Sequence, residues 1–152
     1  IARRMCEAQG PLGQWWWHYD ARRGHVAKHF AVYSVHQHGM APMALHELSE
    51  AGGGNFDSEI ALSMRWIDTN ESGSSMCDEA ASTIWRSLES PEGRATGIVR
   101  GVLETFGRPD PAPSTATSAS TVLNRETRPY EWAWLLYAAA GFGINHDRVS
   151  DD

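Results

Sequence analysis

The residues from Trp15 to Asp20 carry the side chains best suited to chemistry in this sequence. Three adjacent tryptophans are followed by a histidine, a tyrosine and an aspartate. Tryptophan and tyrosine rings stack on the C–H faces of sugars, and a carboxylate or imidazole beside them can hydrogen-bond hydroxyl groups or move a proton. The predicted substrate contacts are Trp15, Trp16, Trp17 and Tyr19, and the predicted catalytic residues are Asp20 and His18.

The three tryptophans cannot all face one core if this segment is extended. Side chains alternate along an extended chain, so Trp15 and Trp17 would point one way and Trp16 the other. At least one ring is then expected to line a cleft or a second layer. The alternative is that the rings only cover the ends of helices, because aromatic residues are frequent in cores.

A second group of polar residues follows at His36 and His38. On a strand these two histidines would share one face, and such a pair can supply two metal ligands. His18 and Asp20 have the same spacing, so a site with four ligands is conceivable. No recognised zinc spacing is present, and we therefore predict no metal and no cofactor. His36 and His38 are predicted to contact the substrate.

The acidic residues have ordinary structural explanations. Asp57 and Asp78 stand where helix caps are expected. Glu131 lies in an otherwise apolar segment and would pair with Arg128, three residues earlier. Hydrolysis of a glycosidic bond generally requires two carboxylates roughly 5 to 10 Å apart. No such pair can be assigned from spacing alone.

The first half of the chain alternates between helical and irregular segments. Residues 1 to 9 are predicted to form a helix, and residues 12 to 38 a short β-hairpin-like insertion with Gly24 at a positive φ. Helices are predicted over 41 to 51, with Pro42 in the first turn, and over 58 to 69. Gly52–Gly54 separates them.

The second half is predicted to contain three more helices. One begins at Asp78, and its inward residues are Ala81, Ile84, Trp85 and Leu88. Another begins near Arg94, and a Pro/Ser/Ala/Thr-rich loop covers 107–121. The last runs from Tyr130 to Ala140, is apolar almost all round, and is therefore expected to be centrally buried.

Composition narrows the class of protein. The chain has 152 residues, of which 41% are hydrophobic, and this favours one globular domain over residues 1–152. A net charge of -6 without a basic stripe argues against nucleic acid as a partner. No apolar stretch is long enough to cross a membrane. Cys6 and Cys77 match no zinc pattern and are expected to be free thiols in the cytoplasm.

The order of these elements resembles one unit of an α/α toroid. A helix leads to Gln9–Gly10 and Gly13–Trp17, a turn follows near Gly24, and Gly39–Ala44 opens a new helix. Six-hairpin glycosidases have this architecture, and terpenoid cyclases have a related one. The resemblance covers about residues 1 to 90 and carries over no catalytic carboxylate. It implies a mainly α fold of helical hairpins, and because the chain begins without Met and supplies few helices, a piece of a larger toroid is expected.

The leading functional prediction is that the chain binds or processes a carbohydrate of the kind that six-hairpin glycosidases handle. If it is an enzyme, the resemblance implies a glycoside hydrolase or a sugar-modifying enzyme. One alternative is a non-catalytic helical interaction module, in which the aromatic segment docks a partner. Another is a metal-dependent hydrolase that uses His36 and His38. The expected partner is a carbohydrate or other small molecule, and the oligomeric state stays open.

Overall fold

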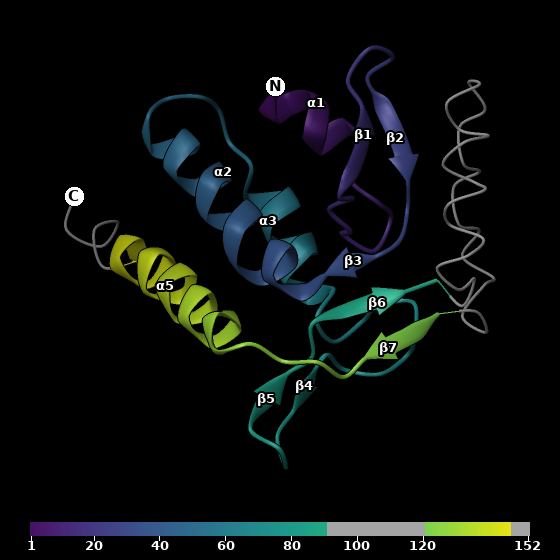
Figure 1. Cartoon of the computed structure of the whole chain (residues 1–152). Coiled ribbons are helices and arrows are strands. Elements are labelled where there is room, and N and C mark those ends of the chain that lie inside the picture. Colours follow the sequence, from purple (N-terminus) through teal and green to yellow (C-terminus); the bar gives the residue numbers. More distant parts are fainter. Residues whose placement is uncertain (91–120, 147–152) are drawn as a thin grey trace.

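A computed structural model describes residues 1–90 and 121–146 of the chain (Figure 1). The helices are α1 (Ala2–Glu7), α2 (Ala41–Glu50), α3 (Asp57–Arg65) and α5 (Pro129–His146), with a short π-helical turn, η1 (His36–Met40). The strands are β1 (His18–Asp20), β2 (His25–Lys28), β3 (Val32–Tyr33), β4 (Cys77–Asp78), β5 (Thr83–Ile84), β6 (Ser87–Glu89) and β7 (Val122–Asn124). Within the described residues these strands form three small antiparallel sheets: β1–β2, β3–β6–β7 and β4–β5.

The fold is therefore a mixed α/β domain, and the predicted all-α toroid of helical hairpins is wrong. The largest error is the helix predicted from Asp78, because residues 77–89 form β4, β5 and β6 instead. Ile84 and Leu88 are buried as predicted, but they lie on separate strands. Apolar residues four apart fit a helix or two short strands equally well when the segment is brief.

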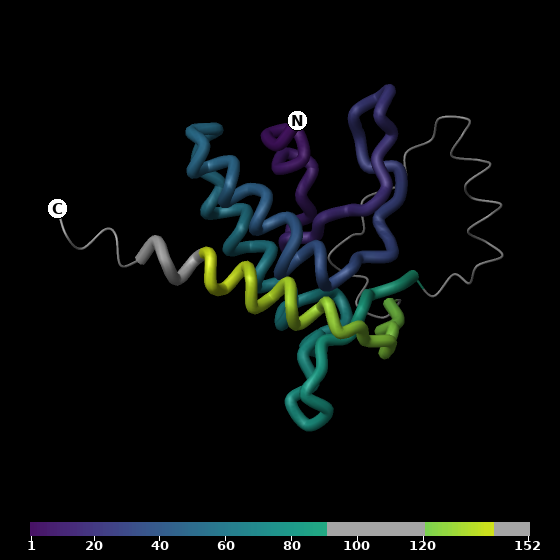
Figure 2. The backbone as a smooth tube through the Cα atoms, turned by 60° about the vertical axis from the view of Figure 1, so that its left-hand side comes forward, coloured from purple at the N-terminus to yellow at the C-terminus, as the bar shows by residue number. Residues whose placement is uncertain are grey.

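Three helices form one side of the molecule. Helices α2, α3 and α5 lie side by side, and α2 contacts both of the others (Figures 1 and 2). Pro42 is in the first turn of α2, and Gly52 follows that helix with φ 80°. The predicted helices over 41–51 and 58–69 thus exist as α2 and α3, although α3 ends at Arg65.

The aspartates at the predicted helix starts do not act as helix caps. No side-chain cap bond is present at α3, where Phe56 is the N-cap residue and Asp57 pairs with Asn55. The Asp78 carboxylate accepts a hydrogen bond from the backbone N–H of Ala81 in the turn between β4 and β5. Asp78 therefore orders a turn, a common use of a short acidic side chain, whereas before α3 the Asn55 side chain has this role because it accepts from the backbone N–H of Asp57.

Two apolar clusters make the core. The first lies between the sheets and the end of α3, and its buried members are Trp16, Val32, Trp66, Ile67, Met76, Ile84 and Leu88. The second lies between α2 and α3, and its buried members are Trp15, Leu45, Phe56 and Ile60. The consecutive residues Trp15 and Trp16 therefore pack into different clusters, which anchors this segment between the two halves of the molecule.

The β1–β2 hairpin lies inside the predicted insertion at residues 12–38. The Asp20 carboxylate accepts hydrogen bonds from the backbone N–H groups of Arg22 (2.9 Å) and Arg23 (3.2 Å). Gly24 has φ 67°, so the positive φ predicted for this turn is confirmed. The pairing of Asp20 with His25 closes the hairpin.

Helix α5 is not centrally buried, which corrects the prediction for residues 130 to 140. Leu136 is 65% exposed, and the large side chains of Tyr130, Trp132 and Tyr137 are also exposed. Glu131, the charged residue of that segment, is instead fully buried. A segment that is apolar all round does not specify which face turns inward, so contacts with other elements decide it.

Two further predictions cannot be compared with the structure. The helix predicted from Arg94 and, apart from Thr121, the loop predicted over 107–121 lie outside the described residues. Among the residues that the structure does describe, no helix is both long enough and apolar enough to cross a membrane.

Candidate functional site

A buried polar cluster joins β3, η1 and α5. The Oε2 atom of Glu131 lies 3.2 Å from Ser34 Oγ and 3.3 Å from His38 Nε2. The side chains of Glu131 and His38 are 0% and 1% exposed. Within the described part of the chain, Glu131 Oε1 and His38 Nδ1 are buried without a hydrogen-bond partner. A buried polar atom without a hydrogen-bond partner destabilises the fold, and most buried polar atoms in proteins have one. These two atoms are therefore an exception to that rule.

The local helix geometry places Ser34 and His38 together. The chain turns helical directly after β3, and residues four apart in a helical turn lie on the same face. The Ser34 hydroxyl is also within 2.7 Å of the Trp85 carbonyl and 3.0 Å of the Arg86 carbonyl. A hydroxyl has one hydrogen to donate, so Glu131 competes with two backbone oxygens for it.

An aromatic surface, defined as Trp17, Tyr33 and His36, lies outside this cluster. The Trp17 and His36 rings are stacked, with centroids 4.6 Å apart and planes 9° apart. Tyr33 meets both rings edge-on, with centroid distances of 6.1 Å and 5.5 Å. The Arg86 guanidinium lies 5.6 Å from the centre of the Tyr33 ring. Trp17 remains 56% exposed, although its neighbours cover one face of the indole.

Burial controls the charge of the histidine in this surface. Desolvation lowers the pKa of His36 below its ordinary value of 6.5; Glu131 opposes this shift, and His38 adds to it. The imidazole is therefore neutral at pH 7, with one nitrogen that donates a hydrogen bond and one that accepts. A hydroxyl group of a ligand can likewise donate one hydrogen bond and accept another, so the neutral imidazole is suited to binding it.

His36 and His38 do not share a face, contrary to the prediction that placed them on a strand. They lie in η1, where residues two apart point to nearly opposite sides of the helical turn. His38 accordingly contacts Glu131 in the interior, and His36 stacks on Trp17. Among the described residues, no group of three or more His, Cys, Asp or Glu side chains is arranged to hold a metal ion.

The structure separates the three predicted tryptophan contacts. Trp15 is buried, and its Nε1–H donates to Ser63 Oγ at 2.6 Å. Trp16 is buried and meets the His29 ring edge-on at 4.6 Å. Only Trp17 of the three is exposed, so the adjacent tryptophans do not form one platform.

The remaining predicted residues lie along β1. His18 is exposed, and Tyr19 is partly buried against the first core cluster, where desolvation raises its pKa. Asp20 is at the hairpin turn, about 10 Å along an extended strand from Trp17. Hydrogen bonds from the backbone of Arg22 and Arg23 lower the pKa of Asp20. Its carboxylate is therefore ionised at neutral pH, a state that suits a base better than an acid.

Glu131 is the site residue whose partners the sequence did not indicate. It was predicted to pair with Arg128, but Arg128 binds Glu126 at 2.6 Å. Two signals were nevertheless present in the sequence. A lone carboxylate in an apolar segment needs a polar partner. Ser34 and His38 are four residues apart, so on a helical turn they lie on the same face and can together provide that partner.

Comparison of the chain with protein-family models, with curated proteins and with solved structures found no match. The chain is accordingly assigned to no family. The aromatic surface and the polar cluster behind it are the features of the molecule that bear on its function.

Proposed function

We propose that the chain binds a carbohydrate on the aromatic surface, with Trp17 as the stacking residue. The observation that carries this proposal is the exposed indole of Trp17, held parallel to His36 at 4.6 Å. A sugar ring stacks its C–H face on the open face of the indole, while the His36 ring, stacked on the opposite face, holds the indole in place. Tyr33 contributes an aromatic edge next to both rings.

The backbone beneath the aromatic surface is held in place, which supports a binding role. The Gln37 side chain accepts from the Trp15 backbone N–H at 3.0 Å and donates to the carbonyls of Trp15 and Tyr33, each at 3.3 Å. One buried amide therefore connects the segment that carries Trp17 to the segment that carries Tyr33 and His36. A surface ordered before binding loses less entropy when a ligand arrives.

Replacing Trp17 with alanine is expected to weaken sugar binding at least about tenfold, because the stacking face is lost. Trp17→Phe retains an aromatic face and should keep most of the affinity. Isothermal titration calorimetry of the whole chain against neutral mono- and oligosaccharides measures both changes. Trp132→Ala removes an exposed tryptophan from α5 and is the matched control. Equal affinities for the parent and the Trp17→Ala variant, or no binding of any sugar, would contradict the proposal.

We also propose that the chain resides in the cytoplasm. Cys6 and Cys77 are both free thiols. Unpaired cysteines are typical of a reducing compartment, which supports this location.

A second candidate function is self-association through α5. The exposed residues between Tyr130 and Ala140 carry no charge; they are Tyr130, Trp132, Ala133, Leu136, Tyr137, Ala139 and Ala140. We propose a second copy of the chain as the occupant of this face. An uncharged apolar helix face needs no complementary partner and can pair with itself about a two-fold axis.

Leu136→Glu is expected to shift a dimer to a monomer, because the new carboxylate would be desolvated at the centre of the contact. Sedimentation equilibrium over a range of concentrations measures the association. Val122→Glu places the same charge on an exposed position of β7 and should leave the dimer intact. A parent chain that stays monomeric at every concentration rules out this function.

A further inference from the structure

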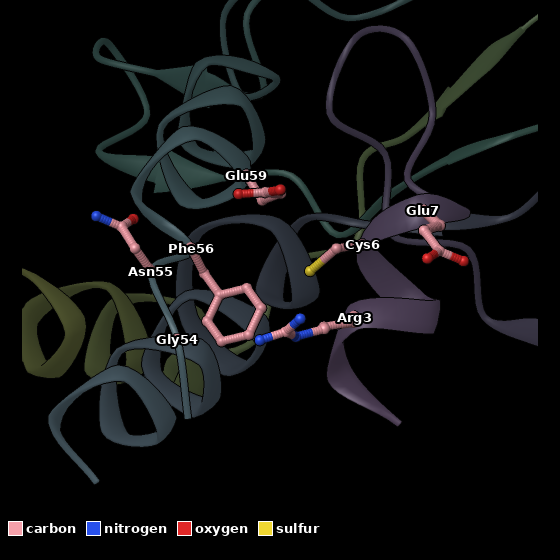
Figure 3. Close-up of a pocket in the computed structure, with 7 residues that line it drawn as sticks. All are labelled: Arg3, Cys6, Glu7, Gly54, Asn55, Phe56 and Glu59. Atoms are coloured by element: carbon pink, nitrogen blue, oxygen red, sulfur yellow. The ribbon is translucent and has the colours of Figure 1, made fainter. Parts of the chain in front are cut away.

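A cavity of about 360 Å³ lies between α1 and the loop that leads from α2 into α3 (Figure 3). Its lining residues are Arg3, Cys6, Glu7, Gly54, Asn55, Phe56 and Glu59. None of them belongs to the aromatic surface or to the polar cluster. The volume is in the range of small-molecule sites.

The floor and one wall of the cavity are apolar. Phe56 is buried in the second core cluster, and Cys6 packs against the same cluster. Figure 3 shows the Phe56 ring and the Cys6 sulfur turned toward the same space. An apolar group of a ligand would therefore meet a preformed surface that needs little rearrangement.

Two opposite charges face this space. Among the described residues Arg3 makes no ion pair, whereas its neighbour Arg4 binds Glu7 at 2.8 Å. Figure 3 shows the Arg3 guanidinium beside the Phe56 ring and the Glu7 carboxylate turned away. Glu59 accepts a hydrogen bond from Ser58 at 2.7 Å but has no cationic partner within the described residues.

Glu59 lines the cavity from α3. Burial raises the pKa of the Cys6 thiol, and the negative charge of Glu59 raises it further. The two charged walls are also connected to one another. Gln9, just after α1, donates to the Glu59 carbonyl at 3.0 Å and so holds the N-terminal segment against α3.

The loop wall depends on a glycine. Gly54 has φ 124°, a conformation that side chains other than glycine rarely adopt. A Cβ atom at this position would lie 3.7 Å from Arg3 Nη2, so the backbone passes close to the guanidinium. The cavity is thus lined on this side by backbone in a conformation that favours glycine.

We propose that this cavity binds a small zwitterion of the α-amino acid class with an apolar side chain. Its carboxylate pairs with Arg3, its ammonium group faces Glu59, and its side chain covers Phe56 and Cys6. A ligand with a carboxylate alone would leave Glu59 unpaired and repelled. A ligand with an amine alone would leave Arg3 without an anion.

The two free cysteines provide an internally controlled test. Leucine should slow alkylation of Cys6, which lines the cavity, but not of Cys77, which is on β4. Protection of roughly fivefold is expected at four times the Kd, because only the free protein reacts. Peptide mapping after timed iodoacetamide labelling gives the two rates. The expected order of protection is leucine first, with 4-methylpentanoate and 3-methylbutylamine far weaker, since each lacks one of the two charges.

Arg3→Gln should abolish the protection by leucine, while Arg22→Gln, in the β1–β2 turn, should not change it. An unchanged Cys77 rate and an unchanged circular dichroism melt show that the Arg3 variant is folded. Equal Cys6 rates with and without leucine overturn the proposal, and so does equal protection by 4-methylpentanoate. Because the cavity shares no residue with the aromatic surface, either result leaves sugar binding to be decided separately.

Discussion

His38→Ala is expected to destabilise the fold by about 3–5 kcal/mol, because it leaves a buried carboxyl group without its partner. Glu131 is fully buried, and His38 Nε2 lies 3.3 Å from its Oε2 atom. After the substitution, Ser34 is the remaining side-chain partner of Glu131 among the described residues, and its hydroxyl also faces two backbone carbonyls. Urea denaturation followed by circular dichroism measures the change in the free energy of unfolding.

A matched double variant separates the lost interaction from the lost volume. His38→Leu combined with Glu131→Leu removes both polar groups and keeps the site filled, and its cost should be well below the sum of the two single changes. Buried ion or hydrogen-bonded pairs often contribute little net stability when both members are replaced by apolar groups. If His38→Ala costs less than about 1 kcal/mol, or if the two changes are additive, the coupling inferred for this cluster does not exist.

Gly13→Ala is expected to destabilise the chain by about 3 kcal/mol or more, because two penalties combine. Gly13 has φ 102°, and a Cβ atom there would lie 2.3 Å from the backbone oxygen of Leu62. Relieving that overlap would move α3 near Ser63, whose hydroxyl accepts from Trp15. The loss should therefore appear in denaturant midpoints and in the near-ultraviolet signal of the packed tryptophans.

Gly73→Ala is the control for this prediction. Gly73 also has a positive φ, 68°, but a Cβ atom there would meet nothing within 4 Å. Only the conformational penalty applies, about 1–2 kcal/mol. Similar losses of stability in the two variants would show that the close approach of Gly13 to α3 is unimportant.

Local signals in the sequence predicted the parts of the fold that depend on neighbouring residues. Pro42 and Gly52 bracket α2, and Gly24 has the positive φ expected of its turn. These predictions succeeded because a proline ring or a missing Cβ restricts the backbone wherever the residue occurs. The same kind of reasoning failed for residues 77–89, where strand pairing with distant segments outweighed a helical spacing of apolar residues.

The candidate site was predicted as a set of residue types but not as a set of contacts. Trp17, His36 and His38 were identified from the sequence, yet His36 and His38 have different partners because η1 is helical. Trp15 and Trp16 were grouped with Trp17, but each is buried in a separate cluster. The alternation of side chains along an extended chain predicts the side to which each ring points. It does not predict which other elements pack against that ring.

The sequence by itself determined the turns and the start and end of α2. It also determined the apolar character of α5. Only the tertiary structure decided that α5 turns Glu131 inward and Leu136 outward. The physical reason is that burial of Glu131 depends on polar partners far away in the chain: Ser34 is 97 residues from it and His38 is 93. Local patterns show that Glu131 needs a polar partner but not which distant residues supply it, because hydrogen bonds and desolvation depend on distance in space and not on separation in the sequence.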